Sequence, residues 1–137
     1  MLSSREGISF KGENMAFTID NNGNITLVQG DSGELVVSGL PTDQSYKVYF
    51  AIQDENRKPV GDEIVVNSNK ASSVIFVLLG SLTDLLTVKK GEDTATYYYG
   101  VKLCSEDDST EDTLLLGDSN IGDKNSITVY PKKVEGI

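Results

Sequence analysis

The segment Glu92-Asp93-Thr94-Ala95-Thr96-Tyr97-Tyr98-Tyr99-Gly100-Val101-Lys102-Leu103-Cys104 decides the fold that this sequence predicts. Aromatic and β-branched residues dominate it, and these residue types favour the pleated, half-buried surface of a β-sheet. Side chains of a strand alternate between its two faces. The more apolar face carries Tyr97, Tyr99, Val101 and Leu103. The opposite face carries Thr96, Tyr98, Gly100 and Lys102. We therefore expect a long central strand whose first set of side chains enters the core.

Short apolar segments separated by turn residues flank this strand. Asn22-Gly23 predicts a tight hairpin, because a primed turn needs positive φ at its central residues. The apolar run at 73–78 predicts a strand buried on both faces, and residues 81–87 are the only helix candidate, with Ser81 as its cap. The spacing of the strands is close to the ~8–12 residues of sandwiches. The sequence predicts an all-β fold, an Ig-like antiparallel β-sandwich of about eight strands with one short helical turn.

The chain length of 137 residues fits a single domain. We expect an N-terminal arm or edge strand at residues 1–13, a β-sandwich domain at 14–131 and a C-terminal tail at 132–137. Cys104 is the single cysteine, so no disulfide can form within the chain, and packing alone must stabilise the core.

The charge of the chain argues against two classes of partner. Twelve basic and 21 acidic residues give a formal net charge of −9, which repels phosphate backbones and anionic lipids. We therefore expect no nucleic-acid and no membrane partner. The N-terminal residues lack the charged and apolar regions of a signal peptide, and no apolar run approaches the ~18–20 residues of a membrane span. We expect a protein made in the cytoplasm.

The residues available for catalysis are few. The chain has no histidine, so neither a Ser-His nor a Cys-His pair can form. Cys104 follows Leu103 at a strand end, which is typical of a small packing residue. Paired carboxylates could hydrolyse glycosides, but they need a cleft with tuned environments. We expect no enzymatic activity and no cofactor.

Two groups of side chains are candidates for binding. An acidic segment follows the central strand, and its candidate calcium ligands are Asp107, Asp108, Glu111 and Asp112. A solvated acidic loop is the alternative interpretation. Tyr49 and Tyr98 remain outside the core by alternation, and they could stack on a sugar or on a protein partner. The alternative is that they only cover a sheet face.

The segment Asp93–Tyr99 resembles the strand-F signature of immunoglobulin domains. In that signature a corner tyrosine bonds back to the backbone, and a cysteine follows two residues later. Tyr97 would be the corner tyrosine, and Tyr99 occupies the cysteine position. The chain has no tryptophan and no cysteine pair, so it is not an antibody-type domain. An ordinary aromatic central strand is the alternative.

Longer stretches resemble the N-terminal Ig-like region of the phage baseplate upper protein family. The phrases that carry the resemblance are residues 25–31 (ITLVQGD), 46–54 (YKVYFAIQD), 82–86 (LTDLL), 97–103 (YYYGVKL), 112–117 (DTLLLG) and 125–131 (NSITVYP). Members of that family continue into coiled-coil or further β-domains, and this chain ends near Ile137.

The resemblance implies a structural adaptor of a phage or prophage tail or baseplate, assembled into the virion of a phage that infects bacteria. It implies that the partners are other virion or tail proteins or further copies of the chain, and it brings no catalytic residues. A carbohydrate-binding or adhesin-type β-sandwich module is the alternative function.

Overall fold

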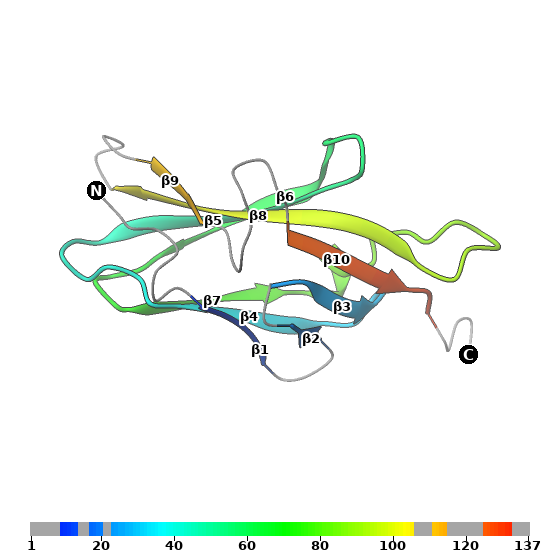
Figure 1. Ribbon diagram of the computed structural model, residues 1–137, viewed down its shortest axis with the longest axis horizontal. Helices are drawn as coiled ribbons and strands as arrows, with labels where there is room; N and C mark the ends of the chain where they lie inside the picture. Colours follow the sequence, from blue (N-terminus) through cyan, green and yellow to red (C-terminus); the bar gives the residue numbers. More distant parts are fainter. Residues whose placement is uncertain (1–8, 14–16, 21–22, 106–110, 115–124, 133–137) are drawn as a thin grey trace.

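The computed structural model describes residues 9–13, 17–20, 23–105, 111–114 and 125–132, and it contains two packed β-sheets (Figure 1). A three-stranded sheet has the order β1-β4-β7, with β1 at Ser9–Glu13, β4 at Gly33–Ser38 and β7 at Ser73–Leu78. A seven-stranded sheet has the order β2-β3-β10-β8-β5-β6, and β9 pairs with β8 beside this path. Its strands are β2 (Thr18–Ile19), β3 (Ile25–Val28), β5 (Tyr46–Gln53), β6 (Pro59–Asn67), β8 (Ala95–Ser105), β9 (Glu111–Leu114) and β10 (Asn125–Tyr130).

The predicted β-sandwich is confirmed, and its strand order is that of an immunoglobulin-like fold. β4 and β7 take the places of strands B and E in one sheet, while β5, β8 and β10 take those of C, F and G in the other. All strand pairs are antiparallel except β3 and β10, which run parallel. Within the described residues no strand occupies the place of strand D beside β7.

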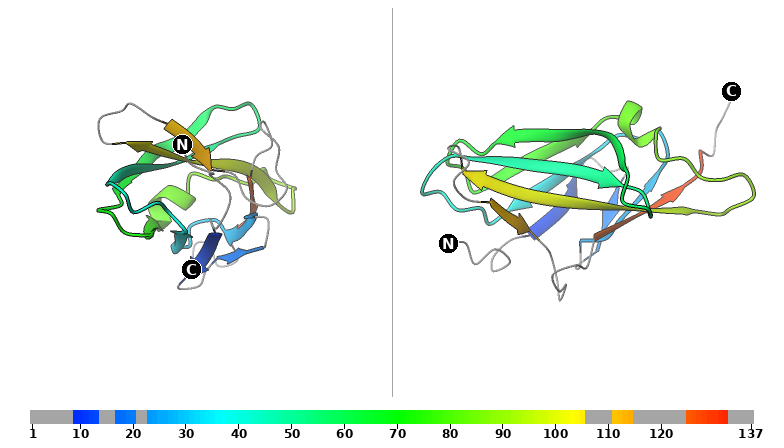
Figure 2. Two further views of the ribbon diagram at one scale, coloured as in Figure 1. Left: turned by 60° about the vertical axis from the view of Figure 1, so that its left-hand side comes forward. Right: turned by 90° about the horizontal axis from the view of Figure 1, so that it is seen from above.

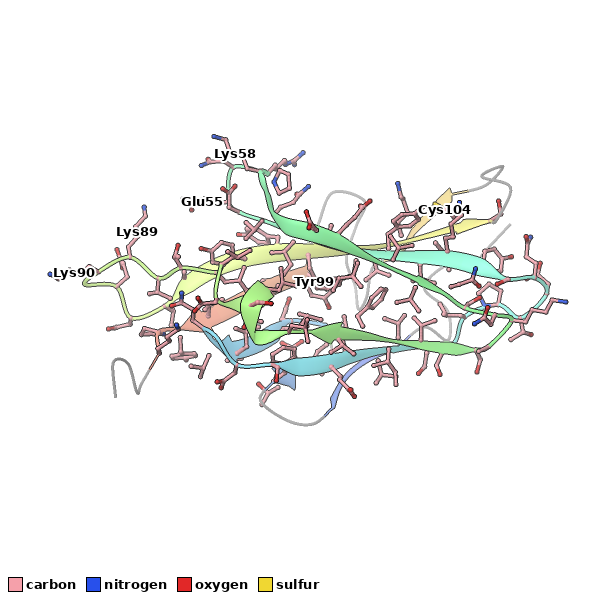
Figure 3. All side chains as sticks on the ribbon, turned by 180° about the vertical axis from the view of Figure 1, so that it is seen from behind. Glu55, Lys58, Lys89, Lys90, Tyr99 and Cys104 are labelled. Atoms are coloured by element: carbon pink, nitrogen blue, oxygen red, sulfur yellow. The ribbon has the colours of Figure 1, made fainter. Side chains whose placement is uncertain are left out.

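The core lies between the sheets and is built by the alternation of buried and outward-facing residues along the central strands. Val48, Phe50 and Ile52 of β5 are buried, as are all four residues that the sequence assigned to the inner face of β8. The Phe50 ring joins the two layers, because its centroid is 5.5 Å from that of Phe76 in β7 and 5.3 Å from that of Tyr99 in β8. Figure 3 shows Tyr99 between the layers. Such aromatic pairs contribute stability beyond their buried area.

The predicted tyrosine corner is present. The Tyr97 hydroxyl donates a hydrogen bond of 2.7 Å to the backbone carbonyl of Thr87, which lies ten residues upstream in the connection between the sheets. Tyr99, at the position of the immunoglobulin cysteine, is buried, and its hydroxyl donates to the carbonyl of Gly23. Burial, with a smaller contribution from the charge of Asp20, raises the pKa of Tyr99 well above its ordinary value.

Two local predictions are wrong. Strand β7 is buried on one face only: Val74, Phe76 and Leu78 fill the core, whereas Ile75 and Val77 are exposed. The reason is that β7 belongs to a two-layer sandwich in which nothing described covers its outer face.

The second wrong prediction concerns the helix cap. Helix α1 is Gly80–Thr83, its first turn starts at Leu79, and no side chain caps it, so Ser81 is not the cap. Instead the buried Thr83 hydroxyl donates to the carbonyl of Asp31, at 2.6 Å, and ties α1 to the turn before β4. Of the helical residues that the structure describes, none forms a segment long and apolar enough to cross a membrane.

Candidate interaction surface

Large apolar side chains lie exposed on β7, at the start of α1 and just after α1. We call Ile75, Val77, Leu79 and Leu85 the β7 patch, and their side chains are 48%, 47%, 58% and 51% exposed. Ile75, Val77 and Leu79 follow each other at every second residue, so they share one face and lie about 7 Å apart along the strand direction. They therefore form a strip along this face, and Leu85, two residues after α1, is a further exposed apolar side chain near its end. Figure 2 shows the ribbon of the sandwich from two further sides.

A groove borders this patch between β6 and β7. We call it the edge groove; it has a volume of about 480 Å³ and is lined by Gly61, Asp62, Glu63, Ile64, Val77, Leu79, Ser81, Leu82 and Leu85. Gly61 is required for its shape: the residue has a φ of +72°, and a Cβ atom there would stand 2.5 Å from Cδ1 of Leu82. A larger residue would strain the backbone at this positive φ and displace the Leu82 side chain that lines the groove.

The edge groove combines an apolar floor with acidic side chains. Ile64 and Leu82 pack against the core from this side, while Asp62 and Glu63 are exposed on β6. Among the described residues that line the groove, none is Lys or Arg. The groove therefore suits an apolar segment that also carries positive charge.

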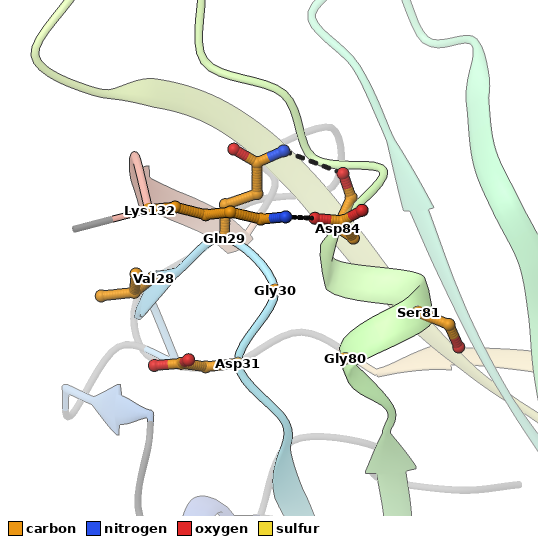
Figure 4. A pocket seen from close by; sticks show the side chains of 8 residues that line it. All are labelled: Val28, Gln29, Gly30, Asp31, Gly80, Ser81, Asp84 and Lys132. Carbon is orange, nitrogen blue, oxygen red and sulfur yellow. Dashed lines mark hydrogen bonds and ion pairs between the residues drawn. The ribbon is translucent and has the colours of Figure 1, made fainter. Parts of the chain in front are cut away.

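A second hollow lies at the end of the sandwich near the C-terminal strand (Figure 4). It has a volume of about 670 Å³ and is lined by Val28, Gln29, Gly30, Asp31, Gly80, Ser81, Asp84 and Lys132.

Its polar groups bind one another. The Lys132 ammonium lies 2.6 Å from the Asp84 carboxylate, and the Gln29 amide donates to the Asp84 carbonyl at 2.9 Å. A Cβ atom on Gly80 would meet the carbonyl oxygen of Gly30 at 2.6 Å, so the backbones touch here. These contacts join the residues that follow β3 and β10 to the two ends of α1, and they are typical of a structural contact rather than a reactive site.

Tyr49 and Tyr98 lie on the same outer face but do not form one platform. In the ladder between β5 and β8, Tyr49 is opposite Lys102 and Tyr98 is opposite Gln53. The two tyrosines are therefore offset by four residues along the strands, which is about 13 Å. The Lys102 ammonium lies 5.6 Å from the centroid of the Tyr49 ring and covers one of its faces. Two coplanar rings for a sugar are not brought together.

The acidic candidates are only partly described. Glu111 and Asp112 lie in β9, opposite Cys104 and Leu103 of β8, while Asp107 and Asp108 lie outside the described residues. In the part of the chain that the structure describes, no group of three or more His, Cys, Asp and Glu could hold a metal ion. Calcium binding by this segment stays a prediction. Cys104 is buried, in agreement with a packing role.

The sequence did not reveal the β7 patch. The segment Val74–Leu79 is apolar at every position, so alternation, which marks a strand with one wet face, is absent. One signal was available in the sequence. In a two-layer protein every second residue of a strand faces outward, so a strand without any charged residue or proline must expose apolar side chains.

No known protein-family model matches the chain, and a comparison with curated proteins found no significant match.

Proposed function

We propose that this protein is a non-enzymatic adaptor that binds other proteins through the β7 patch, as a structural component of a phage or prophage tail or baseplate. The observation that carries the proposal is the contiguous apolar strip of Ile75, Val77 and Leu79, which Leu85 extends. Singly exposed apolar residues are normal, but a contiguous group marks an interaction surface.

The virion assignment rests on the sequence resemblance, which spans residues 24–131. An immunoglobulin-like sandwich agrees with a domain that transmits load between neighbours. The hollows described above offer no converging carboxylates, since Asp84 is paired with Lys132 and the edge groove places its acidic residues on one strand edge. This geometry supports assembly better than hydrolysis.

Carbohydrate binding finds less support. A sugar site needs exposed aromatic rings that lie side by side, and Tyr49 and Tyr98 are offset along the sheet, with Lys102 over one ring. A glycan array with the full chain tests this alternative, and binding that Tyr98→Ala abolishes would favour it over the adaptor function.

The adaptor proposal is tested on particles. Particles from the bacterium that encodes the chain are purified on a density gradient and analysed by mass spectrometry. We expect the chain in a fixed ratio to tail proteins. Val77→Ser should deplete it from particles. Val65→Ser is the matched control, because Val65 is the same residue type with 48% exposure and lies on β6 outside the β7 patch.

Two results would contradict the proposal. The first is a chain that is absent from purified particles although it is abundant in the cell. The second is equal incorporation of the Val77→Ser and Val65→Ser proteins, since the β7 patch would then have no role in assembly.

A further inference from the structure

Two unpaired strand edges face the edge groove. Within the described residues β7 pairs only with β4, and β6 pairs only with β5, so each is the last strand of its sheet on this side. An outer strand presents a row of backbone N–H and C=O groups to solvent. These groups are the template for adding another strand, whose backbone bonds to the edge while its side chains enter adjoining pockets.

The two edges differ in how well they are protected against such pairing. β6 carries Pro59, which cannot donate to a ladder, the acidic residues Asp62 and Glu63, and an irregular register opposite Phe50 and Ile52 of β5. Prolines, charges and bulges are the devices that natural proteins use to block strand addition.

β7 has none of these devices. Its sequence Ser-Val-Ile-Phe-Val-Leu contains no proline, no glycine and no charge, and its register with β4 is continuous over six pairs. It is the kind of edge that pairs readily with an extended segment. Because β6 is protected against pairing and β7 is not, an added strand is expected to pair with β7.

The groove has the dimensions and lining that such a segment needs. Its volume of about 480 Å³ lies within the ~300–1,000 Å³ of ligand pockets. Leu79, Leu82 and Leu85 offer apolar contact to every second side chain of an extended segment running along β7.

Charge decides between the possible occupants. Asp62 and Glu63 border the groove, and the whole chain carries a formal charge of −9. Pairing of β7 with β7 of a second copy would bring two such acidic borders and two strongly negative chains together. A basic segment of another protein would be attracted instead.

We propose that the edge groove binds an extended segment of a partner protein, which adds as a strand to the outer edge of β7. The segment alternates apolar residues, which contact the groove floor and the β7 patch, with Lys or Arg residues, of which at least one faces Asp62 and Glu63. This inference rests on the proposed adaptor function and names its partner class and its mode of binding.

The test starts from a display library of random 12-residue peptides, selected against the full chain with the Val77→Ser protein as the counter-target. We expect enrichment of sequences that alternate apolar and basic residues. Val77→Ser should weaken binding of the selected peptide about tenfold, the effect of one lost valine contact. Asp62→Asn combined with Glu63→Gln should weaken it about 3- to 10-fold, as expected for exposed ion pairs. Val65→Ser should leave it unchanged.

Hydrogen exchange distinguishes strand addition from simple docking. In an antiparallel pair, alternate residues direct their N–H groups toward the partner and the others away, so every second amide of β7 faces the free edge. We expect these amides to exchange rapidly in the free chain and to slow at least about tenfold with the selected peptide.

Any of several outcomes would overturn the inference: no enrichment, peptides without basic residues, peptides that bind both valine variants equally, or bound peptide that leaves β7 exchange unchanged. If the β7 amides of the chain without peptide exchanged more slowly as the protein concentration rose, the partner at this edge would be a second copy of the chain. Incorporation into particles that requires Val77, without protection of β7, would leave the adaptor function standing and remove strand addition. Peptide binding with protection of β7, by a chain that is absent from particles, would leave strand addition standing and remove the adaptor function.

Discussion

Removal of one hydroxyl group tests whether the tyrosine corner stabilises this sandwich. In the Tyr97→Phe protein the ring stays in the core, while the hydroxyl loses its 2.7 Å hydrogen bond to the Thr87 carbonyl and a weaker 3.5 Å contact with the Thr87 side-chain hydroxyl. A hydrogen bond contributes about 0.5–1.5 kcal/mol net, and a carbonyl left without a partner near the core raises the cost toward about 1–3 kcal/mol. Since Tyr97 is largely buried, we expect the free energy of unfolding to fall by about 1–2 kcal/mol.

The assay is urea unfolding followed by tyrosine fluorescence and circular dichroism, with thermal unfolding as a second measure. The midpoint temperature should fall by roughly 3–10 °C at constant m-value, because a domain of this size loses a few degrees per kcal/mol. Tyr49→Phe is the control, since its ring keeps the contact with Lys102 while its hydroxyl is lost. A Tyr97→Phe protein within about 0.3 kcal/mol of the parent, or a control that loses as much, would refute the reasoning.

Three further predictions concern backbone space, a buried hydroxyl and alkaline pH. Gly33→Ala should lower the free energy of unfolding by about 1–3 kcal/mol, because the added Cβ would stand 2.7 Å from the Phe17 ring. Gly100→Ala is the control, because a Cβ there meets nothing within 4 Å, and it should change the free energy of unfolding little or raise it by up to about 1 kcal/mol. Equal losses in urea titrations of the two would contradict this. Thr83→Val should cost about 1–3 kcal/mol in the same assay, because a backbone carbonyl loses its 2.6 Å donor inside the protein; an unchanged midpoint would show that the tie is dispensable. The pKa of Tyr99 is raised in the folded chain, so the folded state holds this proton more tightly than the unfolded state does. The resulting contribution to stability is full below about pH 10 and is lost as the pH rises further. Urea midpoints between pH 8 and 11 should therefore fall less steeply in Tyr99→Phe than in the parent, and parallel profiles would argue against a raised pKa of Tyr99.

The fold was predictable where alternation and burial coincide. In β8 Gly100 and Lys102 separate Tyr99, Val101 and Leu103, and the two-residue period extends this inward face to Tyr97, so all four could be placed correctly from their spacing. The corner hydrogen bond could be predicted as well, because a tyrosine two residues before the position of the immunoglobulin cysteine has a recurrent geometry. Both features are local in the sequence.

Long-range features could not be predicted in the same way. The parallel pairing of β3 with β10 joins residues about a hundred positions apart, and no local pattern encodes it. The cap of α1 was misplaced because the tie that fixes this helix comes from the Asp31 carbonyl, far away in sequence. The edge groove depends on how β6 and β7 diverge at the open side of the sandwich, which follows from the packing of both sheets.

The β7 patch is better explained by binding than by folding. Val74, Phe76 and Leu78 already supply the buried contacts of this strand, whereas Ile75 and Val77 keep nearly half of their surface in water. Threonine fits a strand about as well as valine, so the backbone does not require apolar residues at these outward positions. An exposed apolar edge also makes aggregation easier, which opposes such a composition unless a partner covers it. The neighbouring β6 edge shows that this chain contains the protective residues that β7 lacks, in Pro59 and Asp62. The contrast between two edges of one groove is therefore a stronger argument for strand addition than the exposure of any single residue.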